Sequence, residues 1–115
     1  MRSQRLYLTD ILDAMSDACA FIEGMTLDEV AADRKTQLAL ERCFEIVGEA
    51  AKKVDPELRA RYPEVPWTTM AGMRDVLIHG YWAVQLDVVW DTIKRDLPGL
   101  IPHLRRILRE LPPDA

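Results

Sequence analysis

The chain has 115 residues, of which 49% are hydrophobic and 30% are charged, and this balance predicts one folded domain over residues 1–115 rather than a disordered chain. No run reaches the roughly 18 apolar residues of a membrane span, and the N-terminal segment lacks the features of a signal peptide, so we expect a cytoplasmic protein without a membrane anchor. The formal net charge of -4 argues against a broad basic face that coats nucleic acid, so any contact with RNA must be local.

Two helices are expected in the first third of the chain. The first carries apolar residues at the spacing of an amphipathic helix, and Gly24 is expected to end it. Thr26 and Glu29 have the spacing of a capping box, which predicts a short helix before Asp33 caps the next one. The apolar stripe of the first helix is Leu8, Ile11, Leu12, Met15, Cys19 and Ile22.

A long helix should follow Asp33 and stop at Asp55 and Pro56. Pro56 can occupy the first position of a further short helix through Arg61, with Asp55 as its cap, because the missing N–H costs nothing there. Cys43, like Cys19 in the first helix, falls on an apolar stripe, which favours reduced core cysteines over a structural zinc site. The stripe of the long helix is Leu40, Cys43, Phe44, Val47, Ala51 and Val54.

The remaining sequence predicts two more helical runs. One begins near Trp67 and contains MRDVLIHGYW, after which Gln85 and Asp87 are expected to mark a turn and a new cap. The last run keeps its apolar phase through Pro98 and Pro102, which favours one kinked helix, although two abutting helices also fit. No strand pattern competes, so we predict an all-α antiparallel bundle of four main helices with short extra helices.

The segment RDVLIHGY is the strongest candidate for a functional site. On an α-helix, Asp75 and His79 would share a face, so the carboxylate could orient the imidazole and favour its protonated form. Arg74 lies elsewhere around the helix, but its long side chain could reach a phosphate held beside His79. Such a pair suffices for metal-free attack of an RNA 2′-hydroxyl on its neighbouring phosphate, which would leave a cyclic phosphate. Without further context, a surface salt bridge among these three side chains would be the preferred explanation of the pattern.

The context of this segment resembles the HepT-like members of the HEPN superfamily, small helical ribonucleases that act as toxins beside a minimal nucleotidyltransferase antitoxin. The signature of that family, an arginine and a histidine separated by four residues and then a tyrosine after one more, is matched by Arg74, His79 and Tyr81. Gly72 and Met73 precede it as in the family. The stretches EIVGEAAKKV, YPEVPW and VVWDTIKRDLPGL resemble other family landmarks, so the likeness covers nearly the whole chain.

This resemblance implies a metal-independent RNA endonuclease that needs no cofactor. It implies a homodimer in which two RDVLIHGY segments line one cleft, with Arg74 as phosphate clamp, His79 as acid–base group and Asp75 as the residue that orients His79. It also implies that a nucleotidyltransferase antitoxin inactivates this toxin by adenylylating Tyr81. The alternative hypothesis is a non-catalytic helical adaptor, or substrate-presenting partner, of a nucleotidyltransferase.

Several other polar and aromatic residues have a plainer interpretation. Glu45 and Glu49 have the spacing of a metal-binding or acid–base pair, but we favour contact with solvent, a dimer partner or an arginine. His103 is expected at the surface. Trp67 and Trp90 are expected in the core, whereas Trp82, beside the site, could either pack or stack on a base. A solvated helix face explains the basic residues near the C-terminus, Lys94, Arg95, Arg105, Arg106 and Arg109.

Overall fold

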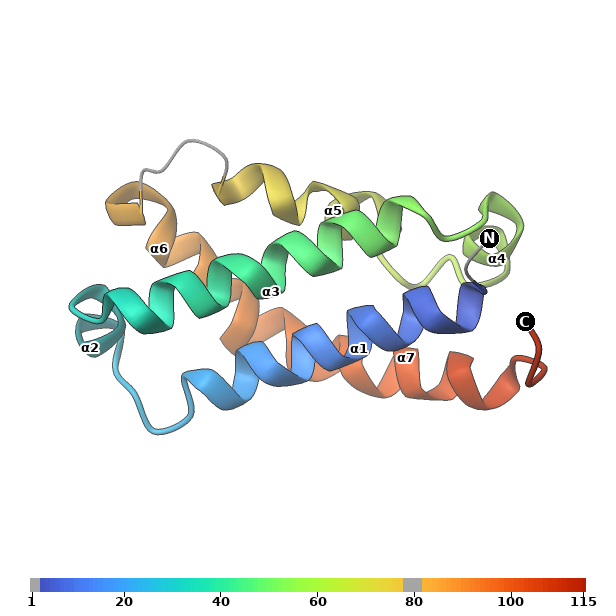
Figure 1. The fold of residues 1–115 in the computed structure, drawn as a ribbon, viewed down its shortest axis with the longest axis horizontal. Helices are drawn as coiled ribbons and strands as arrows, with labels where there is room; N and C mark the ends of the chain where they lie inside the picture. The colour runs from blue at the N-terminus through green and yellow to red at the C-terminus, as the bar shows by residue number, and fades with distance from the viewer. Residues whose placement is uncertain (1–2, 78–81) are drawn as a thin grey trace.

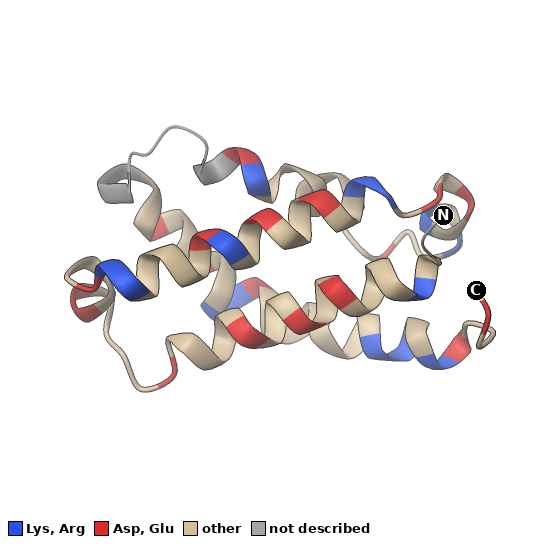
Figure 2. Cartoon of the chain, in the orientation of Figure 1, with Lys and Arg blue, Asp and Glu red and all other residues tan. Residues whose placement is uncertain are grey.

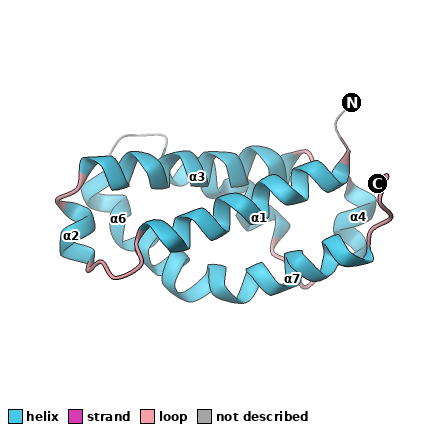
Figure 3. Ribbon diagram, turned by 60° about the horizontal axis from the view of Figure 1, so that its bottom comes forward, coloured by secondary structure: helices cyan, strands magenta, loops and turns pink. Residues whose placement is uncertain are grey.

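The computed structural model describes residues 3–77 and 82–115, and every regular element in these ranges is helical, which confirms the predicted all-α fold (Figure 1, Figure 3). Figure 1 shows that α1 and α3 run antiparallel, that α7 lies beside α1, and that α5 continues along α3. The α-helices are α1 (Gln4–Phe21), α2 (Leu27–Ala31), α3 (Arg34–Lys52), α4 (Pro56–Arg61), α5 (Trp67–Ala71), α6 (Trp82–Asp91) and α7 (Leu97–Glu110). Two further helical segments complete the fold. The 3₁₀ segment η1 (Gly72–Leu77) is wound more tightly than an α-helix, and the π segment η2 (Thr92–Asp96) is wound more widely.

The helix starts in the first half of the chain follow the predicted capping chemistry. Thr26 and Glu29 form a capping box at α2, each accepting a hydrogen bond from the other's backbone N–H. Asp33 caps α3 by accepting from the N–H groups of the next turn. Gly24, just after α1, has a φ of 77°, a conformation that glycine adopts without a steric penalty. Asp55 precedes α4 as predicted, but its side chain makes no capping bond.

The core is formed by the inward stripes of α1, α3 and α7 together with α5. The predicted stripe residues of α1 and α3 are buried, except that Leu12 and Cys19 are partly exposed. Cys19 and Cys43 are both free thiols, and burial raises the pKa of Cys43 to about 11. Trp67 is buried and donates its indole N–H to the Tyr62 carbonyl oxygen at 3.0 Å, which confirms its structural role.

The predicted turn at Gln85 and Asp87 is wrong, because α6 runs through both positions. Leu86, Val89 and Ile93 are buried at helical spacing, and Asp87 is an exposed residue within the helix rather than its cap. The burial of one continuous apolar face therefore prevails over the local turn preference of an aspartate.

The last helical run continues from α6 through η2 into α7 without a break. The N–H of Leu97 donates to the carbonyl oxygen of Thr92, five residues earlier, which defines the π turn. Pro98 directly follows, and its ring would clash with the carbonyl of a regular α-helix four residues before it. We therefore attribute the wider turn to Pro98, whereas Pro102 lies inside α7. This confirms a single run with a local distortion.

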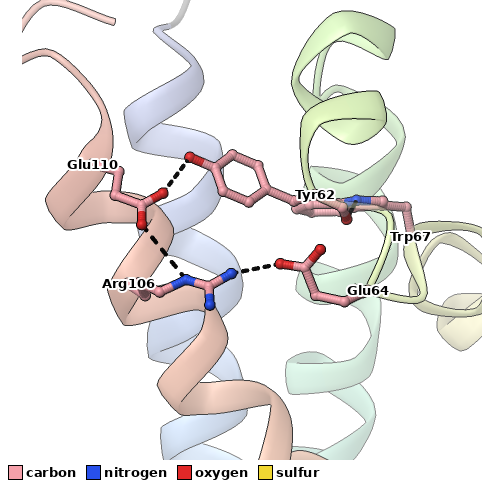
Figure 4. Close-up of polar contacts among 5 residues, drawn as sticks. All are labelled: Tyr62, Glu64, Trp67, Arg106 and Glu110. Atoms are coloured by element: carbon pink, nitrogen blue, oxygen red, sulfur yellow. Dashed lines mark hydrogen bonds and ion pairs between the residues drawn. The ribbon is translucent and has the colours of Figure 1, made fainter.

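Ion pairs and hydrogen bonds tie the basic face of α7 to the segment between α4 and α5 (Figure 4). The Nη2 atom of Arg106 lies 2.5 Å from Oε1 of Glu64, and its Nε atom lies 3.7 Å from Oε1 of Glu110. The Tyr62 hydroxyl donates to the Glu110 carboxylate at 2.7 Å, and this bond raises the pKa of Tyr62. These partners explain part of the C-terminal basic cluster without any ligand.

Acidic and basic residues are unevenly distributed over the helices. Figure 2 shows acidic residues along α1 and basic residues towards the C-terminal end of α7. Among the helices that the structure describes, none is long and apolar enough to cross a membrane.

Candidate ribonuclease site

The structure places Arg74 and Asp75 in η1, with both side chains exposed and Met73 buried beside them. Within residues 73–75, the side chain of Met73 therefore faces the core, and those of Arg74 and Asp75 face outward. His79 and Tyr81, with the rest of residues 78–81, lie outside the described residues. The expected α-helix is wrong for residues 72–77, since a 3₁₀ segment turns about 120° per residue and does not align positions four apart. The pairing of Asp75 with His79 stays a prediction.

Close packing against α3 fixes the backbone at Arg74. Gly48 lies in the interior of α3, where a Cβ atom would come within 2.9 Å of both the Cβ and the backbone N of Arg74. It would also lie 3.3 Å from the carbonyl oxygen of Ala71. Two of these three neighbours are backbone atoms, which cannot rotate away. Glycine at position 48 is therefore what lets η1 approach α3 this closely.

The next residue on α3, Glu49, forms an ion pair with Arg74. The Nη1 group of Arg74 donates to one carboxylate oxygen of Glu49, and both side chains are nearly half exposed, at 47% and 43%. Glu45, one turn earlier, instead pairs with Arg42 at 2.8 Å. Of the alternatives expected for these two glutamates, namely solvent, a dimer partner or an arginine, the structure shows an arginine beside each.

The ion pair with Glu49 uses only part of the hydrogen-bonding capacity of the Arg74 guanidinium. Arginine carries five N–H donors in a planar fork that matches the oxygens of a phosphate. Among the side chains that the structure describes, residues 3–75 and 85–115, Glu49 is the one partner of Arg74, and none of them engages its Nε or Nη2 group. An exposed, anchored guanidinium with an open edge is suited to holding a phosphodiester.

Side chains that could bind a metal are dispersed in the described part of the chain. No group of three or more His, Cys, Asp or Glu side chains in the described part of the chain is arranged to hold an ion. Glu45 and Glu49 are engaged by arginines rather than directed at a shared point.

Comparison with known proteins identifies the chain. A model of the ribonuclease HepT-like family matches residues 11–107. The chain belongs to the HepT-like ribonuclease family. "Probable ribonuclease HepT" of Thermococcus cleftensis is 41% identical over 99 residues, which are 86% of this chain and 90% of the relative. "Putative RNase MJ0127" of Methanocaldococcus jannaschii is 38% identical over 107 residues, 93% of this chain and 88% of the relative. No solved structure gives a significant match.

Membership of the HepT-like ribonucleases makes this chain an endoribonuclease with an all-α, HEPN-like fold, as the resemblance predicted. The matched span contains RDVLIHGY and also Gly48 and Glu49. The sequence offered a signal for the first of these two residues, Gly48. A glycine inside an amphipathic helix costs about 1 kcal/mol relative to alanine, so its presence indicates a close approach by another segment. It could not reveal which segment approaches.

Proposed function

We propose that this HepT-like ribonuclease cuts RNA without a metal ion, using Arg74 as phosphate clamp, His79 as acid–base group and Asp75 to orient His79. The RNA 2′-oxygen attacks the adjacent phosphorus as His79 accepts the hydroxyl proton, and the bond from phosphorus to the 5′-oxygen breaks. The departing oxygen takes a proton from the His79 imidazolium formed in this way, which restores the neutral imidazole and leaves a cyclic phosphate and a 5′-hydroxyl end. Arg74 stabilises the charge that builds on the phosphate.

The observation that carries this proposal is the anchored and exposed guanidinium of Arg74. It stands on a backbone packed tightly against α3, so its position is set by the fold. The Nε and Nη2 groups along its other edge are spaced so that they can donate two parallel hydrogen bonds to phosphate oxygens. The ribonuclease family of the chain supplies the substrate class.

The test is cleavage of RNA by the purified protein in the presence of a chelator, with Arg74→Ala and His79→Ala measured alongside. We expect the wild type to generate cyclic phosphate ends and both variants to lose cleavage while keeping their helical circular dichroism. Loss of activity in chelator would refute metal independence. A wild type that binds a nucleotidyltransferase but leaves RNA intact would favour the adaptor alternative.

A homodimer would double the phosphate-binding donors at this site. Each copy supplies one guanidinium, Arg74, whose charge is offset by its ion pair with Glu49 and by the neighbouring Asp75, so binding of RNA must depend on directed hydrogen bonds rather than on net positive charge. Two copies around a two-fold axis would combine two guanidinium groups in one cleft. Light scattering at micromolar concentration should give the mass of a dimer, and a monomer that cleaves RNA would refute the shared cleft.

We further propose that the chain is the toxin of a toxin–antitoxin pair and that a nucleotidyltransferase silences it by adding AMP to Tyr81. The added phosphate would compete with RNA for Arg74, and its bulk would obstruct the cleft. Intact-mass spectrometry after reaction with a minimal nucleotidyltransferase and ATP should show AMP on the wild type and none on Tyr81→Phe. AMP that persists on the variant would exclude Tyr81 as the acceptor.

A further inference from the structure

We infer that Glu49 is a positioning residue of the ribonuclease site, which holds the Arg74 guanidinium by one end and presents its other edge to the scissile phosphate. The inference rests on the proposed role of Arg74. It adds α3 to a site that the signature segment alone would confine to residues 74–81.

Two contacts from adjacent positions of α3 act on different parts of Arg74. Gly48 permits the close approach that fixes the backbone and Cβ of Arg74. Glu49 then fixes the far end of the same side chain, because its carboxylate accepts from Nη1. An arginine side chain has considerable rotational freedom. A contact at each end therefore reduces the number of conformations that Arg74 samples before it reaches a reactive geometry.

The ion pair leaves the binding function of the guanidinium intact. Glu49 uses one oxygen and one of the terminal nitrogens of Arg74, so the contact is not a fork that would occupy the whole group. The Nε and Nη2 donors point along a different edge, and that edge can form two parallel hydrogen bonds to phosphate.

The charge of Glu49 makes its role distinguishable from simple attraction of RNA. A carboxylate beside a phosphate site repels the substrate, so its removal should not weaken binding. The benefit of Glu49 must instead appear after RNA has bound, as a larger fraction of complexes with Arg74 aligned. A positioning role therefore predicts a loss in kcat without a rise in KM.

The experiment compares Glu49→Ala, Glu49→Gln and Glu45→Ala in steady-state cleavage of a short RNA. Glu45→Ala is the matched control, since it removes a carboxylate that pairs with Arg42 on the same helix but does not touch Arg74. We expect Glu49→Ala to lower kcat about fivefold, the ratio equivalent to the roughly 1 kcal/mol upper range for an exposed ion pair. Glu49→Gln keeps an acceptor oxygen and should recover most of this loss, and Glu45→Ala should cleave as the wild type does.

Two further measurements keep the outcomes separate. Circular dichroism and thermal melting establish that the variants are folded. In the second measurement, Glu49→Ala is repeated in an Arg74→Lys background. There the loss in kcat should be smaller, because lysine lacks the planar guanidinium fork that Glu49 is inferred to position. Faster cleavage by Glu49→Ala would show that Glu49 blocks the clamp, and an unchanged kcat would show that it does nothing, so either result overturns the inference. If Arg74→Ala itself cleaves normally, the proposed function fails instead.

Discussion

The packing of Gly48 against Arg74 allows a sharp test of how the fold holds the site. In Gly48→Ala the new methyl group would lie 2.9 Å from the Arg74 Cβ and 2.9 Å from its backbone N, so η1 must move away from α3. Overpacking of this kind costs about 1–3 kcal/mol, and the better helix propensity of alanine returns up to about 1 kcal/mol. We expect a net loss of about 1–2 kcal/mol, which lowers the Tm by roughly 4–8 °C.

The same substitution at Gly72 is the matched control for this experiment. Gly72 is two residues before Arg74, its own Cβ would meet nothing within 4 Å, and its φ of -81° suits alanine. Thermal melting and RNA cleavage should both be impaired in Gly48→Ala and nearly unaffected in Gly72→Ala. A Gly48→Ala protein with the wild-type Tm and full cleavage would show that the contact between α3 and η1 does not hold Arg74 in place.

Three further predictions concern stability rather than the site. Leu104→Ala, which empties a fully buried position in α7, should cost about 2–5 kcal/mol in urea unfolding, whereas Leu38→Ala at an exposed position of α3 should cost little. Asp33→Ala should lower the Tm at neutral pH because α3 loses its cap. Since hydrogen bonds to Thr36 lower the pKa of Asp33 in the folded protein, this difference should vanish as the pH falls well below 3.8. Cys43 is favoured as a neutral thiol in the fold, so unfolding free energy should decrease as the pH rises from 9.0 towards about 11, and the decrease should be smaller in Cys43→Ala.

The first half of the fold was predictable because its helix boundaries depend on neighbouring residues. The capping box of Thr26 and Glu29 and the cap at Asp33 are local hydrogen bonds that side-chain type and spacing specify. The apolar stripes of α1 and α3 likewise depend on a period that can be read directly. The boundary near Asp87 was not predictable in this way, because packing of α6 overrides a local turn preference.

The candidate site was only half predictable for a similar reason. Arg74 and Asp75 stand out by their pattern, and the structure exposes both side chains. The contacts that hold Arg74 come from a helix more than twenty residues earlier, with 25 positions separating it from Glu49. Periodicity within one segment contains no information about such a partner. The segment also changes from α to 3₁₀ geometry at Gly72, which its helical periodicity did not predict.

The two ends of the fold meet, which has a practical consequence for rearranging the chain. The backbone N–H of Arg5 donates to the carbonyl oxygen of Ala115 at 3.3 Å, and the Arg5 guanidinium donates to that of Leu108 at 2.8 Å. Both ends lie opposite α2 and α6 (Figure 1). A short glycine linker could therefore join them, and new termini could be opened in the exposed turn at Glu23 and Gly24. Such a circular permutant would keep α3 and η1 on one uninterrupted stretch of chain, so it would change the order in which the helices are synthesised without dividing the segment that brings Gly48 against Arg74.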